Sequence, residues 1–391
     1  MGASRQLIRV LLQQNTVAHY RARLYDALSR EPGLEFEFVA DPRSDTPFMA
    51  TALEAGHRLE LTACRVWKVS LLGLPEIYFQ PGALGRLLLG EFDVAIALGS
   101  PYSITTWLML VVGPLVGTRV LLWTHGLLGP ESGPKWWLRR LLYRCSSGLL
   151  LYGDRAKLLL MAQGLARTSL FVVKNSLDPD AQEQAEDRLQ ADSAATLRQR
   201  LDIRADDRVL IFIGRLQPVK RLDLVVRALA ALRARSLRVH LILLGEGSEH
   251  QALERLAEQQ NVRQLVHFEG AKYEETAIAA YFGISDLCVI PSGAGLTVMH
   301  ALGYGTPVIT HDRPELQFPE VEAISPGETG DLYREGDFDS LVDVVLRALV
   351  PESMKTRVGP ACRARILSDY HPTRHAARMA EAVRSAMAGA R

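Results

Sequence analysis

Two series of apolar, strand-like runs alternate with helix-like segments along this chain. The first series contains "LIRVLLQ", "LEFEFVA", "FDVAIALG", "TRVLLWTHG" and "GLLLYGD", and the second contains "RVLIFIG", "RVHLILLGEG", "LVHFEG", "LCVIPSG" and "TPVIT". Strands separated by helices predict a parallel sheet, and continuous apolar strands are typical of sheets that helices cover on both faces. We therefore expect an α/β protein with two doubly wound, Rossmann-like domains that face each other across a cleft.

A charged segment without a strand separates the two series. Residues 178–208 are rich in Ala, Gln and charged side chains, and 391 residues are too many for one ordinary core. We predict an N-terminal domain over residues 1–178 and a C-terminal domain over residues 179–370. Residues 371–391 are predicted to form a terminal helix after a Pro start, with packing back on the N-terminal domain as one option.

Charge, cysteine usage and hydropathy narrow the function classes. The formal net charge of +1 does not indicate bulk attraction to nucleic acid, and the four scattered cysteines suit a reducing cytoplasm. The start of the chain is predicted to be a first strand rather than a secretion signal. Residues 94–118 carry no charge, but Gly99-Ser100-Pro101 and Gly113-Pro114 interrupt them. We favour a buried strand, a turn and a buried helix there over a membrane span.

Two cations follow a strand in "LIFIGRLQPVKRLDLVVRAL". The strand ends at Gly214, and Arg215 and Lys220 flank the turn before an amphipathic helix. Cations at the carboxyl end of a parallel strand, beside a helix N-terminus, are well placed to bind a phosphate. The alternative interpretation is a pair of solvated surface cations.

A run of small residues stands where a later helix begins, at Ser292-Gly293-Ala294-Gly295 in "LCVIPSGAGLTVMH". The amides of Gly295, Leu296 and Thr297 would start this helix without internal partners, and with the helix dipole they predict an anion site. The alternative is a tight strand-to-helix turn that needs glycine for steric reasons only.

His125 follows the strand in "LLWTHG", so it is expected at the carboxyl end of the first sheet, as a catalytic or a structural histidine. Asp178-Pro-Asp180 and Asp337-Phe-Asp339 match the pattern D-x-D, but their positions lead us to assign no metal. The sequence contains no G-x-S-x-G elbow and no visible Ser/His/Asp arrangement.

The order of these motifs resembles that of the retaining family-4 glycosyltransferases of the GT-B fold, of the type found in bacterial glycan biosynthesis. "FVVKNSLD" is similar to their "vvpNGvD", "FIGRLQPVKRLDLVVRAL" to "yvGRL…KG.d.ll.A", and "LILLGEGSEHQAL" to "l.ivGdGp….l". "VHFEGAKYEE" is similar to "V.f.G.v..ee", and the glycine loop to "PS..EGfGl..lEAmA.G.PVI". The resemblance covers nearly the whole chain and is strongest from Asn175 to Gly330.

This resemblance implies a nucleoside-diphosphate sugar as substrate, with UDP and GDP sugars first, and no cofactor. The cations and the loop amides would hold the diphosphate, the segment at Gly270 to Lys272 would lie beside the base, and His125 would approach the transferred sugar. Fixed cations and amides would then stabilise the leaving group. The implied donor-binding residues are Gly214, Arg215, Lys220, Gly270, Lys272, Ser292, Gly293, Ala294, Gly295, Leu296, Thr297 and His300, and the implied catalytic residues are His125, Arg215 and Lys220.

The chain departs from the family pattern in two places. The family's Glu-x7-Glu falls on Ser292 and His300, so both carboxylates are replaced and the donor is left open. The usual Gly-Gly loop near the N-terminus is missing, and His19, Tyr20 and Arg21 are predicted to face the acceptor instead.

The segment "PKWWLRRLLYRCSSG", which includes Lys135 to Arg144, combines cations with tryptophans on one predicted helix. This combination suits peripheral contact with an anionic bilayer, and the alternative is an amphipathic helix that packs its tryptophans on the sheet.

The resemblance, together with these features, implies a metal-independent hexosyltransferase that acts on a glycan or lipid-linked acceptor, and the resemblance alone implies transfer with retention. Its place would be polysaccharide or glycolipid synthesis, in the cytoplasm or on the inner face of the cell membrane. A nucleotide-sugar epimerase of the same fold and a catalytically silent nucleotide-sugar-binding protein are the alternatives. No nucleic-acid partner is expected.

Overall fold

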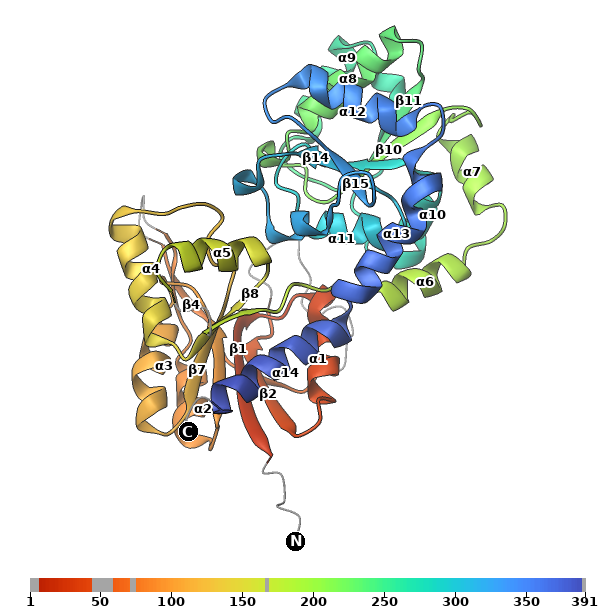
Figure 1. Cartoon of the computed structure of the whole chain (residues 1–391). Coiled ribbons are helices and arrows are strands. Elements are labelled where there is room, and N and C mark those ends of the chain that lie inside the picture. The colour runs from red at the N-terminus through yellow and green to blue at the C-terminus, as the bar shows by residue number, and fades with distance from the viewer. Residues whose placement is uncertain (1–6, 44–58, 71–74, 166–168, 389–391) are drawn as a thin grey trace. The chain divides into compact units, whose positions relative to one another are not determined.

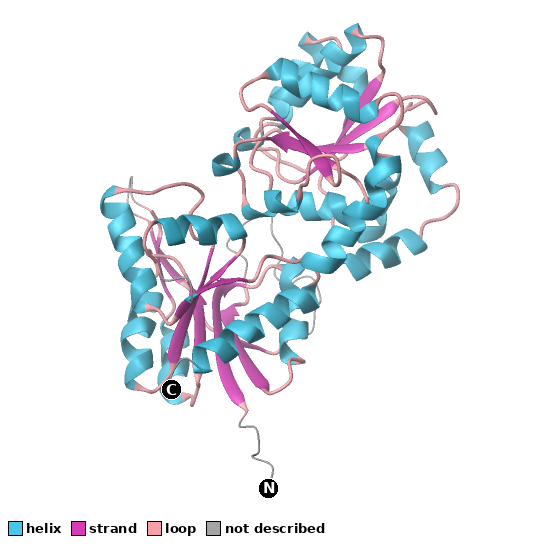
Figure 2. Ribbon diagram, in the orientation of Figure 1, coloured by secondary structure: helices cyan, strands magenta, loops and turns pink. Residues whose placement is uncertain are grey.

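The computed structural model describes residues 7–43, 59–70, 75–165 and 169–388. The chain divides into two compact units, Met1–Leu177 with Pro372–Arg391, and Asp178–His371, so the predicted boundaries lie one residue away from these divisions. Each unit contains one parallel sheet with helices on both faces (Figure 1, Figure 2). The predicted class of two Rossmann-like α/β domains is confirmed, and the cleft between them stays a prediction.

In the first unit, strand β1 (Ile8–Thr16) pairs in parallel with β2 on one side and with β6 on the other. The strand order is β3-β2-β1-β6-β7-β8-β9. Doubly wound folds bind ligands where the strand order reverses, which here is between β1 and β6 at their carboxyl ends. The other elements are α1 (Ala22–Ser29), β2 (Leu34–Asp41), β3 (Leu61–Ala63), β4 (Trp67–Val69), β5 (Ile77–Phe79), α2 (Pro81–Leu89), β6 (Val94–Leu98), α3 (Ile104–Leu115), β7 (Arg119–Thr124), α4 (Gly133–Cys145), β8 (Gly148–Leu151), α5 (Asp154–Ala162), β9 (Leu170–Val172) and α14 (Pro372–Ala388).

Successive side chains of β1 point to opposite faces of this sheet and enter two different cores. Leu12 packs in the cluster that contains α1 and α14, whereas Leu11 packs in the cluster that contains α2 and α3. Helix α14 contributes Met379 and Val383 to the first cluster and lies against α1 (Figure 1). The C-terminal helix therefore completes the core of the N-terminal unit.

Residues 94–118 form β6, α3 and the turn before β7, as the glycines and prolines predicted. The prediction that this helix is buried is wrong for one face, because Val111 is 64% exposed and Leu115 is 80% exposed. Uncharged side chains alone do not distinguish a buried helix from an exposed apolar face. Within the described residues, none of the helices has the length and apolar character needed to cross a membrane.

In the second unit, β10 (Arg208–Ile213) pairs in parallel with β11 and β13, so the strand order reverses between β10 and β13. The complete order is β12-β11-β10-β13-β14-β15. The glycine loop and the turn with Lys220 follow the two strands at this switch point. The other elements are α6 (Pro179–Asp187), α7 (Ser193–Arg200), α8 (Leu222–Ala234), β11 (Val239–Leu244), α9 (His250–Gln259), β12 (Val266–Phe268), α10 (Glu275–Gly283), β13 (Leu287–Val289), α11 (Leu296–Gly303), β14 (Val308–His311), β15 (Gly330–Tyr333), α12 (Phe338–Leu349) and α13 (Met354–Asp369).

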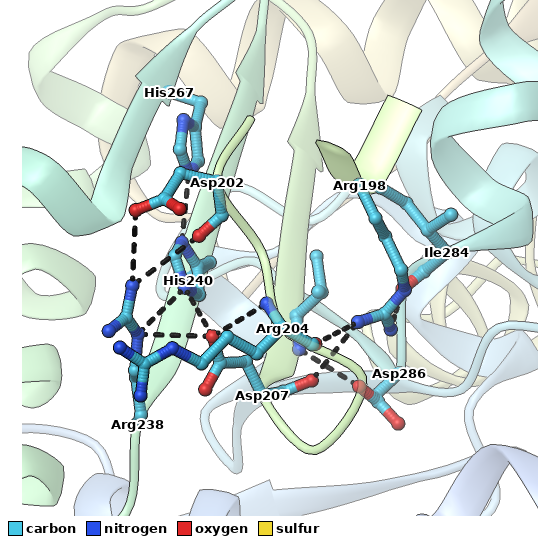
Figure 3. A network of polar contacts seen from close by, with 10 residues as sticks. Arg198, Asp202, Arg204, Asp207, Arg238, His240, His267, Ile284 and Asp286 are labelled. Atoms are coloured by element: carbon cyan, nitrogen blue, oxygen red, sulfur yellow. Dashed lines mark hydrogen bonds and ion pairs between the residues drawn. The ribbon is translucent and has the colours of Figure 1, made fainter. Parts of the chain in front are cut away.

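A polar network fixes the start of this sheet (Figure 3). The carboxylate of Asp207 accepts a hydrogen bond from the Arg204 amide at 2.9 Å and lies 3.0 Å from Arg238 Nε. His240 of β11 lies 3.1 Å from the same carboxylate through Nε2 and 2.9 Å from His267 of β12 through Nδ1. Because His240 is fully buried, these bonds satisfy polar atoms that would otherwise destabilise the sheet.

Candidate functional site

Lys220 connects the turn after β10 to the glycine loop after β13. Its ammonium donates a hydrogen bond to the carbonyl oxygen of Gly293 at 2.5 Å, and its nitrogen lies 5.6 Å from the centre of the Phe318 ring. Burial lowers the pKa of Lys220, Glu320 opposes this shift, and Arg215 adds to it. A partly buried cation therefore sits at the switch point of the second sheet, and it is not a solvated surface lysine.

The glycine loop is tightly packed by the protein's own side chains. Gly293 has φ +62°, and a Cβ at this position would lie 3.4 Å from Lys220 Nζ. A Cβ on Gly295 would lie 3.3 Å from the Phe318 ring. The steric interpretation is supported at Gly295, where a side chain would press on Phe318, whereas Gly293 is favoured by its positive φ.

The predicted cradle of amides is smaller than the sequence suggested. The Ala294 amide donates to Gln317 Oε1 at 2.6 Å, and Gln317 is 2% exposed. In the described part of the chain, Val298 is the first residue of α11 whose amide donates to a backbone carbonyl, that of Gly295 at 2.8 Å. The amides at Leu296 and Thr297 remain as the dipolar start of the helix, and the role predicted for the Ala294 amide needs correction.

Thr297 joins this helix to the first cationic turn. Its hydroxyl donates to the carbonyl oxygen of Ile213 at 2.8 Å, and it lies close to Gly214, whose φ is +141°. Arg215 follows directly and is partly buried. The structure therefore brings together Gly214, Lys220, Gly293 and Thr297.

Ser292 and His300, which are predicted to stand at the family's two carboxylate positions, have different surroundings. Ser292 lines a cavity of about 360 Å³ together with Arg221, His311 and Tyr333. His300 lies elsewhere on α11, where its Nε2 is 2.9 Å from Glu275 Oε1, which also accepts the Tyr304 hydroxyl at 2.6 Å. Glu275, the first residue of α10, was not predicted as a site residue, and its signal in the sequence is the "YEE" at the start of that helix.

Gly270 and Lys272 lie in the loop after β12, which begins with Glu269. The Glu269 carboxylate accepts hydrogen bonds from the Tyr281 hydroxyl at 2.5 Å and from Arg200 at 2.7 Å. Gly270 has φ +67°, which glycine adopts at low cost. Lys272 is partly buried, and no contact places it at the loop around Lys220.

Tyr152 contacts His125, which was predicted to be catalytic, and Arg21, which was predicted with His19 and Tyr20 for the acceptor side. The rings of His125 and Tyr152 stack with centres 4.4 Å apart, and Arg21 donates to the Tyr152 hydroxyl at 2.7 Å. The Tyr20 ring lies 5.7 Å from the Arg21 guanidinium carbon and 5.8 Å from the His19 ring. Surrounding protein atoms and then Arg21 lower the pKa of His125, although part of its imidazole is open to solvent.

The two D-x-D matches serve as helix caps. Asp178 accepts a hydrogen bond from the Ala181 amide, and Asp337 accepts one from the Ser340 amide. Among the residues that the structure describes, no group of three or more His, Cys, Asp or Glu side chains is arranged to hold a metal ion.

Parts of the sequence are similar to known glycosyl transferases. Residues 193–365 match the family model described as "Glycosyl transferases group 1". A D-inositol 3-phosphate glycosyltransferase of Catenulispora acidiphila is 30% identical over 177 residues, which cover 41% of this chain and 40% of that protein. The chain spans 30% to 51% of the length of the first curated relatives it matches.

Solved structures extend the likeness to nearly the whole fold. Anabaena HepE in complex with UDP aligns with a TM-score of 0.73 at 16% identity and covers 97% of this chain and 100% of its own. A candidate UDP-N-acetylglucosamine 2-epimerase from Listeria monocytogenes aligns with a TM-score of 0.60 at 17% identity, over 98% of both chains. These likenesses show a shared GT-B fold, and the family match lies in the second unit.

Proposed function

We propose that this GT-B protein, whose residues 193–365 match the group 1 glycosyl transferases, moves a hexose-type sugar from a nucleoside-diphosphate sugar to a glycan or lipid-linked acceptor. The single observation that carries the proposal is the partly buried Lys220 ammonium, held against Gly293 at the switch point between β10 and β13. A buried cation beside a helix N-terminus favours a phosphate ligand over water. The bound UDP of the Anabaena structure supports this choice of ligand class.

In this proposal the diphosphate accepts the hydrogen bond that the Lys220 ammonium donates to the Gly293 carbonyl in the free protein. Arg215 and the amides of Leu296 and Thr297 complete the cradle, and together they stabilise the negative charge that develops as the sugar leaves. These groups supply positive charge without a metal ion, so we propose a metal-independent reaction that EDTA leaves unchanged. Retention of configuration stays part of the proposal.

Two histidines have proposed roles near the sugar and the ribose. His125 has a lowered pKa, so we propose that it acts as a neutral hydrogen-bonding group beside the acceptor. On α11, the pair of His300 and Glu275 places a carboxylate beside the position where the family's second glutamate is missing. A carboxylate can accept hydrogen bonds from ribose hydroxyls, so we propose Glu275 as the ribose partner.

The test is a panel of UDP and GDP sugars incubated with purified full-length protein, with and without polyprenyl-phosphate glycans as acceptors. We expect release of UDP or GDP from one donor class, with the sugar transferred when the acceptor is present, and an α-linked product from an α-linked donor. Intact donors throughout the panel would leave a silent binding protein as the better description.

Epimerisation is the second candidate, because the Listeria structure shares this fold over 98% of the chain. Incubation with the donor alone distinguishes the two. An epimerase converts the donor into an isomeric sugar with no acceptor present, whereas a transferase leaves it unchanged or hydrolyses it slowly.

We propose peripheral membrane contact through α4. Trp136 packs against the core, but Trp137 is 66% exposed, and Lys135 and Arg144 are exposed on the same helix. Exposed aromatic and basic side chains on one helix suit an anionic bilayer interface. We expect Trp137→Ser to weaken flotation with phosphatidylglycerol vesicles, while Trp67→Ser, which removes another exposed tryptophan, does not. Equal flotation of both variants would count against α4.

A further inference from the structure

Arg21 is a partly buried cation whose hydrogen-bond acceptors, among the residues that the structure describes, are neutral. Its guanidinium donates to the Tyr152 hydroxyl at 2.7 Å and to Gln14 Oε1 at 3.5 Å, and both of these acceptors are neutral. Its carbon lies 4.5 Å from the centre of the Trp123 ring. Within the described ranges, no carboxylate forms an ion pair with Arg21. Because buried charges in proteins are normally paired, this arrangement lacks a negative group.

The side chains around Arg21 also leave hydrogen-bond donors unused. Gln14 is 6% exposed and Trp123 is 2% exposed, yet among the described residues Gln14 Nε2, Trp123 Nε1 and Arg21 Nε have no acceptor. Each unsatisfied buried donor destabilises the fold. Three unused donors beside an uncompensated cation are complementary to a ligand that accepts hydrogen bonds and carries negative charge.

The position in the fold is right for such a ligand. Gln14 lies near the carboxyl end of β1 at the switch point with β6. Arg21 ends the 3-10 turn His19–Arg21 that leads into α1, and the Ala22 amide donates to the His19 carbonyl oxygen within this turn, so the positive charge at this place comes from the Arg21 side chain. His125 is stacked on Tyr152 and exposed, so the cluster of Gln14, Arg21, Trp123 and Tyr152 lies beside a surface that solvent reaches.

We infer that this cluster binds an anionic group, a phosphate or a carboxylate, of the substrate that receives the sugar. The role of this site in binding the acceptor rests on the proposed glycosyl transfer, whereas the anion site itself does not. In this arrangement Arg21 binds the anion, Trp123 and Gln14 add hydrogen bonds, and the hydroxyl to be glycosylated is placed beside His125. Arg21 is thus a specificity-determining residue for charged acceptors.

The experiment titrates the full-length protein with inorganic phosphate and, separately, with succinate, at constant ionic strength set with sodium chloride. Calorimetry gives the affinity, and thermal melting gives an independent readout. The variants are Arg21→Gln, Arg21→Lys and Trp123→Phe. Arg30→Gln is the matched control, because Arg30 lies at the end of α1, is largely exposed and pairs with Asp26. Lys220→Ala controls for anion binding in the second unit.

In the Lys220→Ala background, where the proposed anion site of the second unit is removed, we expect Arg21→Gln to weaken binding of the preferred anion at least about tenfold and to abolish the anion-dependent rise in melting temperature. In the same background Arg21→Lys should retain part of the affinity, Trp123→Phe should lose a smaller part, and Arg30→Gln should leave the affinity unchanged. A preference for phosphate over succinate points to a phosphorylated acceptor, and the reverse to a carboxylated one.

Equal anion binding and equal stabilisation in wild type and Arg21→Gln would overturn the inference. Even if Arg21→Gln failed to fold, unchanged affinity in both Arg21→Lys and Trp123→Phe would overturn it. The outcome is separable from the proposed function: phosphate binding that depends on Arg21, in a protein without transferase activity, would sustain the site and reject glycosyl transfer. Glycosyl transfer in a protein whose phosphate binding does not depend on Arg21 would sustain the proposed function and reject the anion site.

Discussion

Lys220 is the residue on which the donor site depends most. Its ammonium is held by a backbone carbonyl rather than by a carboxylate, so no charge has to be displaced when a diphosphate binds. Gly293 permits this contact, because its φ of +62° and its missing side chain leave room for the lysine. The same contact explains why the loop is built from small residues.

We therefore expect Lys220→Ala to reduce turnover at least about 100-fold, since a fixed donor aimed at developing charge is lost. The fold should stay intact, because the substitution removes one hydrogen bond at the rim of the sheet. Far-ultraviolet circular dichroism and a steady-state assay measure the two effects. Arg227→Ala, which removes an exposed cation from α8, is the control and should keep wild-type turnover, whereas near-normal turnover in Lys220→Ala would refute the role.

At the scale of elements, the histidine pair that joins β11 to β12 links stability to pH. Burial lowers the pKa of His267 to about 4, with His240 adding to the shift and Glu269 opposing it, and Arg263 and Arg200 lowering it further. The unfolded chain, with an ordinary histidine pKa of about 6.5, therefore takes up this proton first as the pH falls. The contribution of neutral His267 is complete above pH of about 6.5 and is lost as the pH falls toward about 4.

Urea unfolding from pH 7 to pH 4 tests this linkage. We expect the free energy of unfolding to fall with pH less steeply in His267→Gln than in the wild type, because the glutamine cannot take up a proton. His250→Gln is the control, since His250 stacks on Phe268 of the same strand at the surface. Identical slopes in wild type and His267→Gln would contradict the assignment.

Sequence patterns predicted the elements better than their contacts. The long strands β1, β7, β10 and β11 were predictable because a continuous apolar run has few other uses in a parallel fold, whereas the short strands β3 and β15 were missed. The contact between Arg21 and Tyr152 was not predictable, because 131 residues separate them in the sequence. Only the strand order of the folded sheet, which contains both β1 and β8, brings them into the same unit. The exposed face of α3 was missed for another reason: it carries no charge, so it has the same pattern as a buried helix.

At the proposed donor site, too, the elements were predictable from the sequence and most side-chain contacts were not. Glycine and lysine in the right order after strands predicted that Lys220 and the loop would meet, and they do. The capture of the Ala294 amide by Gln317 and the pairing of His300 with Glu275 depend on side-chain packing between segments. Such contacts leave no periodic signal in the sequence.

At the scale of the whole molecule, each unit has its own sheet, its own cores and its own cationic site at a switch point. The second unit contributes Lys220 and the start of α11, and the first contributes Arg21 and His125. In the proposed function, the nucleotide binds to the second unit and the receiving substrate binds to the first. Each assignment can therefore fail without the other.

The measurement that tests the central claim most directly is the affinity difference between UDP and uridine, or between GDP and guanosine, in wild type and Lys220→Ala. Calorimetry with the preferred nucleotide isolates the contribution of the diphosphate, and the nucleoside reports that the rest of the site is intact. We predict that the diphosphate strengthens binding to the wild type at least about tenfold and adds little in Lys220→Ala, while nucleoside affinity is equal in both. An equal gain from the diphosphate in both proteins would show that its binding site lies elsewhere.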